Sequence, residues 1–342
     1  MNRMDFDTII IGMGPGAAAI AHRIAGTGAR IAMTPGVGCA RFKHLDGGLV
    51  TTASLESAFG TSVGAPLQQV RTHTVFRRDL LEAWTTDQVR DRVTIVEGFD
   101  DLRVVPHEGG RYAVHEESGI RVLVGRQVIL TEGASPKISI AAGIRPDFEP
   151  EDLLHFGRMI VPGVQASNPV SGAWRTSWGM PAWYTVVPHP EGAIVGASAR
   201  IENIMRIGRD GREVVKDFLR SPLGDHLGLH VEPATVGMEL VPLQHGAGTT
   251  PVQADRILIT PDANGSIDPR SLSRYEDVLR AGIRIGDLLL GEWPNMPDWH
   301  VHRDIWQVRP ANGTPYHDSR ETGFIEDGAG KPRGLLQRLV RR

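Results

Sequence analysis

The sequence contains a single cysteine, Cys39, among its 342 residues. One thiol excludes an intramolecular disulfide and a zinc site built from several thiolates, so the fold must be stabilised by packing. No N-terminal targeting segment is recognisable, because the apolar run at residues 8–12 is too short for a signal peptide or a membrane span. We therefore expect an intracellular, cytoplasmic protein.

The sequence also lacks long runs of one charge. Its 37 basic and 40 acidic residues give a formal net charge of −3, and no basic arm is present, which argues against a nucleic-acid partner. Residues 335–342 carry three arginines beside a small apolar face, a pattern more typical of a solvated helix end than of a membrane contact. We expect a small molecule as the partner, and no feature specifies an oligomeric state.

What the sequence does contain is a strand, helix and strand pattern near its start. Residues 7–12 and 30–33 are rich in β-forming residues, and residues 17–25 have a helical pattern. This spacing predicts a parallel βαβ unit of about 30 residues. Residues 102–130 then alternate in short segments separated by glycine-containing turns, which predicts an antiparallel meander.

The middle of the chain differs from its two ends. Several β segments between residues 151 and 245 predict a separate, mainly antiparallel sheet, whereas residues 256–260 and 271–290 predict a buried strand and a helix of the first domain. The fold class is therefore α/β. We predict a discontinuous Rossmann-like domain, residues 1–150 and 246–342, and a substrate-side β-sheet domain, residues 151–245.

A glycine-rich loop follows the first predicted strand. Its sequence, Gly12-Met13-Gly14-Pro15-Gly16-Ala17, matches G-x-G-x-x-G/A and opens the predicted helix. Gly12 permits a tight turn, Gly14 lets a pyrophosphate approach the main chain, and Ala17 allows the helix to lie close to the strand. The alternative is an ordinary glycine-rich turn, but the flanking strand and helix favour a dinucleotide site that includes Gly16.

The end of the second predicted strand departs from this pattern. Dinucleotide folds usually place Asp or Glu there to bind a ribose hydroxyl, but this chain has Met33-Thr34-Pro35-Gly36. Thr34 could offer a neutral hydrogen bond, or Arg41 could reach the adenosine side. We therefore expect weakened binding at the adenosine end.

Three further segments resemble motifs of FAD-dependent oxidoreductases of the geranylgeranyl reductase and aromatic hydroxylase type. Residues 128–135, VILTEGAS, resemble a strand followed by ADGxxS, with Glu132 in the Asp position and Gly133 after it. Residues 256–269, RILITPDANGSIDP, resemble LLVGDAAGxxxP, and residues 75–80, VFRRDL, resemble VxRxxLD.

This resemblance covers most of residues 5–290 and implies an FAD/NAD(P)-binding domain. It implies that Asp262 binds the ribityl chain of FAD, with Gly265 and Pro269 beside it, and that Arg77 lies near the cofactor. It also implies reduction, desaturation or hydroxylation of a small, largely apolar molecule, with NAD(P)H as the electron donor.

Two segments depart from the family pattern. The family follows the residue equivalent to Pro269 with a glycine-rich LTGEGI turn, but this chain brings Leu272 and Arg274 to that place. Residues 45–49, LDGGL, resemble the CGGGL loop of the reductases without its cysteine. These departures predict weak FAD binding. They leave open a reused fold that acts as a non-redox cyclase, isomerase or binding protein.

The candidate catalytic residues come from a loose motif and from acid/base chemistry. Trp183 begins WYTVVP, which resembles the YxWxFP box of geranylgeranyl reductases, although ordinary sheet aromatics explain it equally well. Thr185 replaces the second tryptophan of the halogenase WxWxIP box, which disfavours halogenation. His73, His189 and Asp46 are the acid/base candidates.

Other chemistry has less support. His300 and His302, with Asp304 nearby, have the spacing of metal ligands, but the surrounding sequence is loop-like and predicts solvated histidines rather than a metal site. No nucleophile elbow, P-loop or H-E-x-x-H motif occurs.

Overall fold

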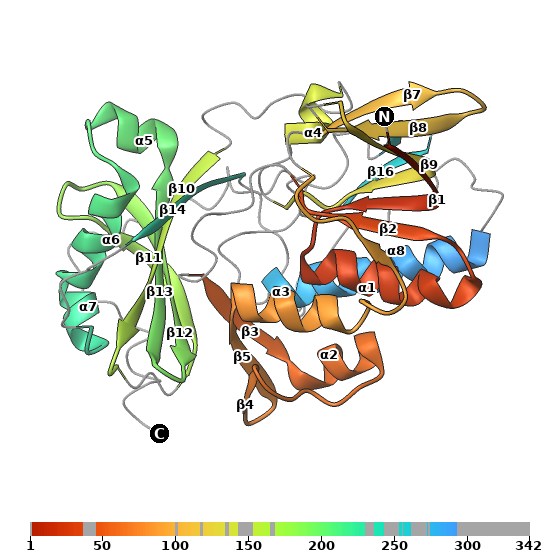
Figure 1. Ribbon diagram of the computed structural model, residues 1–342. Coiled ribbons are helices and arrows are strands. Elements are labelled where there is room, and N and C mark those ends of the chain that lie inside the picture. The colour runs from red at the N-terminus through yellow and green to blue at the C-terminus, as the bar shows by residue number, and fades with distance from the viewer. Residues whose placement is uncertain are drawn as a thin grey trace.

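The computed structural model describes residues 2–36, 46–99, 102–116, 119–133, 137–142, 153–164, 168–229, 236–242, 253–254, 256–260, 272 and 274–292. The predictions for several residues lie outside these ranges: Cys39, Arg41, Asp262, Gly265, Pro269, His300, His302, Asp304 and residues 335–342. Within the described ranges the chain forms three sheets with helices packed beside them (Figure 1).

The largest sheet has eight strands. They are β1 (Asn2–Ile11), β2 (Ile31–Thr34), β6 (Thr94–Ile95), β7 (Arg103–His107), β8 (Arg111–His115), β9 (Arg121–Leu130), β15 (Gln253–Ala254) and β16 (Ile257–Ile259). The strand order is β15-β16-β9-β1-β2-β6, and β16, β9, β1, β2 and β6 pair in parallel. β7 and β8 form the predicted antiparallel meander with β9.

Helices cover one face of this sheet. Residues of β7, β8 and α4 (Lys137–Ala141) pack on the other face. The helices are α1 (Pro15–Ile24), α2 (Thr52–Phe59), α3 (Arg78–Asp87) and α8 (Arg274–Glu292), and α1 packs along α8 (Figure 1). Alternate residues of β1 enter opposite cores: Ile10 packs with the helices, whereas Ile9 and Ile11 pack with Phe99 and Tyr112. Burial on both faces explains why the carboxyl end of β1, residues 9–11, is a continuous run of isoleucines.

A second sheet is antiparallel and has five strands. They are β10 (Leu153–Pro162), β11 (Val170–Arg175), β12 (Pro181–His189), β13 (Gly192–Arg200) and β14 (Gly237–Pro242), in the order β11-β12-β13-β10-β14. One face is covered by α5 (Ile201–Arg206), α6 (Gly211–Leu219) and α7 (Pro222–His226). We call the opposite face, which carries Trp183, Phe156 and Arg158, the inner face.

A third, three-stranded sheet lies between the two larger ones (Figure 1). Its strands are β3 (Gly47–Thr51), β4 (Gln68–Val70) and β5 (His73–Arg77), in the order β3-β5-β4. The sequence analysis assigned residues 75–80 to a family motif with Arg77 near the cofactor, but it did not predict the strand β5. The strand β3 of this small sheet lies between the second sheet and α8, because Gly47 contacts Ile194 and Gly48 contacts Tyr275.

The structure confirms the predicted α/β fold with a parallel-containing sheet and a separate antiparallel sheet. The predicted helix at residues 271–290 appears as α8 with shifted ends, as is usual for helix boundaries. Within the described part of the chain, no helix has both the length and the apolar character needed to cross a membrane.

Candidate functional site

Four parallel strands bring their carboxyl ends to one edge of the large sheet. Ile11 of β1 pairs with Thr34 of β2 and with Leu130 of β9, and Leu130 pairs with Ile259 of β16. The Gly12 amide donates to the Thr34 carbonyl at 2.8 Å, which ties the glycine loop to the end of β2. Open α/β sheets bind ligands outside this edge.

Gly12 and Gly14 have different roles in the loop. Gly12 has a φ of +130°, and a Cβ there would overlap Thr131, so this position requires glycine for its conformation and its packing. Gly14 has a φ of −74° and caps the start of α1, and a Cβ there would meet no described atom within 4 Å. The space beside Gly14 is therefore open.

The N-terminus of α1 suits an anion at this open space. Among the described residues no side chain caps it, and its first turn contains no acidic residue. Pro15 begins the helix and has no amide hydrogen, so Gly16 and Ala17 supply the first main-chain donors. The amides and the positive end of the helix dipole then favour a phosphate in front of Gly14.

Gly16 also serves helix packing. A Cβ at Gly16 would lie 3.0 Å from Val278 Cγ1 on α8, and a Cβ at Gly282 would lie 2.5 Å from the Gly16 carbonyl oxygen. Ala17 is buried. Small side chains therefore let α1 and α8 approach closely, and α8 supports the loop from behind.

Thr34 ends β2, where the sequence predicts a neutral hydrogen bond to a ribose. Its Oγ1 has no hydrogen-bond partner among the described residues, although the residue is fully buried. Threonines at the ends of β9 and β16 differ, because Thr131 Oγ1 donates to the Ile11 carbonyl at 2.9 Å and Thr260 Oγ1 to the Leu130 carbonyl at 3.1 Å. A sugar hydroxyl would satisfy Thr34 without a charge.

Glu132 has a local structural role. Its two carboxylate oxygens accept the amides of Ile138, at 2.6 Å, and Ser139, at 3.0 Å, at the start of α4 (Lys137–Ala141). Gly133 next to it has a φ of +72°, which favours glycine. These two residues therefore shape the loop after β9, and a direct contact of either with a cofactor stays a prediction.

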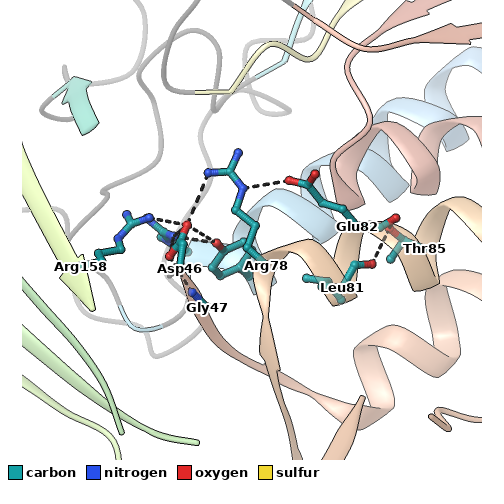
Figure 2. Close-up of polar contacts among 9 residues, drawn as sticks. Asp46, Gly47, Arg78, Leu81, Glu82, Thr85 and Arg158 are labelled. Carbon is teal, nitrogen blue, oxygen red and sulfur yellow. Dashed lines mark hydrogen bonds and ion pairs between the residues drawn. The ribbon is translucent and has the colours of Figure 1, made fainter. Parts of the chain in front are cut away.

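Asp46, immediately before β3, is the centre of a buried ion cluster (Figure 2). Arg274 Nη2 lies 2.9 Å from both carboxylate oxygens, Arg78 Nη1 lies 3.4 Å from one of them, and Arg158 forms a third ion pair. The Tyr275 hydroxyl donates to the same carboxylate at 2.9 Å. We call these five residues the Asp46 cluster.

These contacts give Asp46 a structural role, and its acid/base role stays a prediction. Burial alone would raise the pKa of Asp46, but Arg158, Arg274, Arg78 and the Tyr275 hydroxyl outweigh it and hold the pKa well below its ordinary value. Burial raises the pKa of Tyr275 to about 12. A carboxylate held ionised in this way is not available to donate a proton near neutral pH.

The other polar candidates are spread along β5 and β12. Arg77 forms two hydrogen bonds to Asp79, at 2.8 and 3.0 Å. His189, at the end of β12, accepts the Glu191 amide on Nδ1 at 3.2 Å, and burial lowers its pKa, with Glu191 opposing and Arg77 adding to that shift. His73 lies at the opposite end of β5 from Arg77. The structure therefore brings Arg77 near His189 and separates both from His73.

Trp183 lies on the inner face of the second sheet. It packs against Leu154, Phe156 and Val241, whereas Tyr184, next to it in sequence, stacks on Phe218 of α6 at a centroid distance of 4.8 Å. Phe156 shares its face of β10 with Arg158, which reaches Asp46. Trp183 is therefore directed to the side from which the nucleotide-binding unit approaches, and its role in a pocket wall stays a prediction.

The sequence analysis missed Arg158 and the structural role of Tyr275. A signal for Arg158 was present, because it interrupts the otherwise apolar segment FGRMIVP. A cation in a strand buried on both faces requires an anionic partner. No sequence signal identified that partner as Asp46.

No protein-family model matches the chain, and no curated protein sequence matches it. Solved structures do match its fold. A geranylgeranyl bacteriochlorophyll reductase-like protein from Thermoplasma acidophilum is 16% identical, with a TM-score of 0.71 over 89% of this chain and 83% of that one. The flavin-dependent brominase Bmp2 is 14% identical, with a TM-score of 0.66 over 88% and 83%.

The myxobacterial chondrochloren halogenase CndH, a FAD-dependent halogenase, is 16% identical, with a TM-score of 0.61 over 88% of this chain and 78% of that one. These similarities confirm that the chain has the two-domain fold of FAD-dependent enzymes, as the sequence motifs predicted. At such low identities the likeness establishes the fold alone. Reaction and substrate depend on the chemistry of the site.

Proposed function

We propose that this chain, which has the two-domain fold of FAD-dependent enzymes, is an FAD-dependent oxidoreductase that acts on a small, largely apolar molecule. One observation carries the proposal: the space in front of the α1 N-terminus is open at Gly14, where a Cβ would meet no described atom within 4 Å. A helix start without an acidic first turn or a side-chain cap is suited to a pyrophosphate.

The residues present fit two parts of FAD, the pyrophosphate and the adenosine ribose. Gly14 and the first amides of α1 would hold the pyrophosphate, and the hydroxyl of Thr34, which has no partner among the described residues, would bind the adenosine ribose. A neutral hydrogen bond contributes less than a charged one. We therefore propose that FAD binds more weakly than it would with a carboxylate at the end of β2.

The flavin end is compatible with the side chains at the start of α8. Arg274 was expected to occupy the space of the flavin ring, but its guanidinium group is held by Asp46, with both oxygens at 2.9 Å. The side chain therefore has a fixed position within the Asp46 cluster. This contact supports retention of a flavin site despite the missing glycines.

FAD, when bound, supplies the electron or hydride transfer, and the protein binds and orients the reactants. Trp183 is only partly buried and lies against buried Leu154 and Phe156 on the inner face of the second sheet, which supports an apolar wall for the substrate there. We propose NAD(P)H as the electron donor. Reduction, desaturation and hydroxylation are all compatible with these residues.

The proposal is tested by titrating the purified protein with FAD and, separately, with ADP. We expect saturable binding of both, with higher affinity for FAD and a change in the visible spectrum of the flavin. Addition of NADH or NADPH under anaerobic conditions should then bleach bound FAD. Equal affinity for FAD and ADP, with no spectral change, would contradict a flavoenzyme and favour a non-redox reuse of the fold.

A further inference from the structure

The Asp46 cluster joins elements that are distant in sequence. Asp46 precedes β3, Arg78 begins α3, Arg158 lies on β10 of the second sheet, and Arg274 and Tyr275 begin α8. Arg274 and Asp46 are separated by 228 positions. Figure 2 shows Arg78 between Asp46 and Glu82, with Arg158 approaching Asp46 from another part of the chain. One carboxylate thus links the nucleotide-binding unit to the substrate-side sheet.

Apolar contacts surround this link on both sides. The Tyr275 ring packs edge-to-face on Phe76 at a centroid distance of 4.9 Å, and a Cβ at Gly48 would lie 2.8 Å from that ring. Gly47 lies against Ile194 of β13 so closely that a Cβ would overlap it. The two glycines after Asp46 therefore allow the small sheet to contact α8 on one side and the second sheet on the other.

A single helical turn connects the Asp46 cluster to the phosphate loop. Arg274 and Val278 are four residues apart on α8, about one turn, and Val278 is the residue that packs against Gly16. Glu276 holds the same turn to β3 by accepting the Thr51 amide at 2.9 Å. Removal of Asp46 therefore leaves α8 attached to β3, but it removes the carboxylate that Arg274 and Tyr275 of α8 share with Arg158 of the second sheet.

We propose that Asp46 is a positioning residue, whose carboxylate fixes the first turn of α8 against the inner face of the second sheet and so sets the geometry of the flavin end of the site. This inference rests on the proposed FAD function. The phosphate loop is supported by Val278 and Gly282, and Glu276 keeps this part of α8 on β3 without Asp46. Asp46 should therefore affect the affinity for FAD and leave the affinity for ADP, which lacks the flavin end, unchanged.

The experiment measures FAD and ADP dissociation constants for the full chain and for Asp46→Asn, at a temperature where both are folded. We expect the ratio of FAD to ADP affinity to fall at least about tenfold in Asp46→Asn, with ADP affinity within about twofold of the unmodified protein. Asp287→Asn is the matched control. It removes a carboxylate from α8, the helix that Asp46 contacts. Asp287 pairs there with Arg23 on α1 at 3.3 Å, and its loss should leave the ratio unchanged.

Tyr275→Phe provides a second, milder variant if Asp46→Asn does not fold. It removes the hydroxyl that donates to Asp46 and accepts from Arg274, and it keeps the ring against Phe76 and Gly48. The ratio should therefore fall by about two- to fivefold. Suppose that the unmodified protein binds FAD more tightly than ADP and that the folded variant has the same ratio of FAD to ADP affinity. That result would overturn the role of Asp46 and leave the proposed function intact. No preference for FAD in the unmodified protein would overturn the proposed function, and this inference with it.

Discussion

The phosphate loop and the Asp46 cluster are built in opposite ways. The loop consists of small residues close in sequence, Gly12 to Ala17, and leaves main-chain donors beside an open space. The Asp46 cluster consists of long charged side chains from separate elements and is closed around a buried carboxylate. The comparison supports our proposal that the loop binds a ligand and that the cluster fixes the framework around it.

The largest expected effect is on stability in the Asp46 cluster. Asp46→Asn removes the anion shared by buried Arg158 and the partly buried Arg78 and Arg274, and breaking a buried pair typically costs about 3–5 kcal/mol. Urea denaturation should show a loss of unfolding free energy in that range. Asp287→Asn, in a partly exposed pair, should cost less than about 1 kcal/mol. Losses below about 1 kcal/mol in both variants would contradict the claim that Asp46 stabilises the fold through buried ion pairs.

The acid stability of the protein should also depend on Asp46. The pKa of Asp46 is lower in the folded protein than in the unfolded chain, so its contribution is complete above about pH 4 and is lost as pH falls further. The unfolding free energy of the unmodified protein should fall below pH 4 by up to about 1.4 kcal/mol per pH unit from this group. Asp46→Asn lacks the group, so its unfolding free energy should change less steeply over the same pH interval. Equal slopes in urea titrations at several pH values would refute the assignment.

The smallest expected effect concerns Thr34. Thr34→Val keeps the branched shape and removes the hydroxyl that has no partner among the described residues, so stability without ligand should stay within about 1 kcal/mol or rise. FAD affinity should fall by about two- to tenfold, because one hydrogen bond to the ribose is lost. Unchanged affinity for both FAD and ADP would place the ribose elsewhere.

The sequence predicted the phosphate loop because all of its determinants are local. The β-forming residues of β1 and the glycine spacing specify the turn, and the small residues of α1 follow directly. The same local reasoning could not identify the role of Asp46. A buried carboxylate and a catalytic carboxylate have the same sequence signature, and only the fold brings Arg158 and Arg274 to it.

Other differences also come from contacts that are distant in sequence. Gly16 was assigned to the cofactor through its motif, but its packing against Val278 depends on a helix more than 250 residues away. The strand β5 was recognised as a motif, yet its pairing with β3 and β4 was not predicted. Tertiary contacts determine these features, and they leave little trace in local sequence patterns.

The most direct test of the central claim compares FAD binding to the unmodified protein and to Gly14→Val. Because a Cβ at Gly14 would meet no described atom within 4 Å, and its φ of −74° suits any residue, the variant should keep its melting temperature within a few degrees. The valine side chain would occupy the space of the pyrophosphate, so affinity for FAD and for ADP should fall at least about a hundredfold. Retained affinity for both ligands in the folded variant would contradict nucleotide binding at this loop.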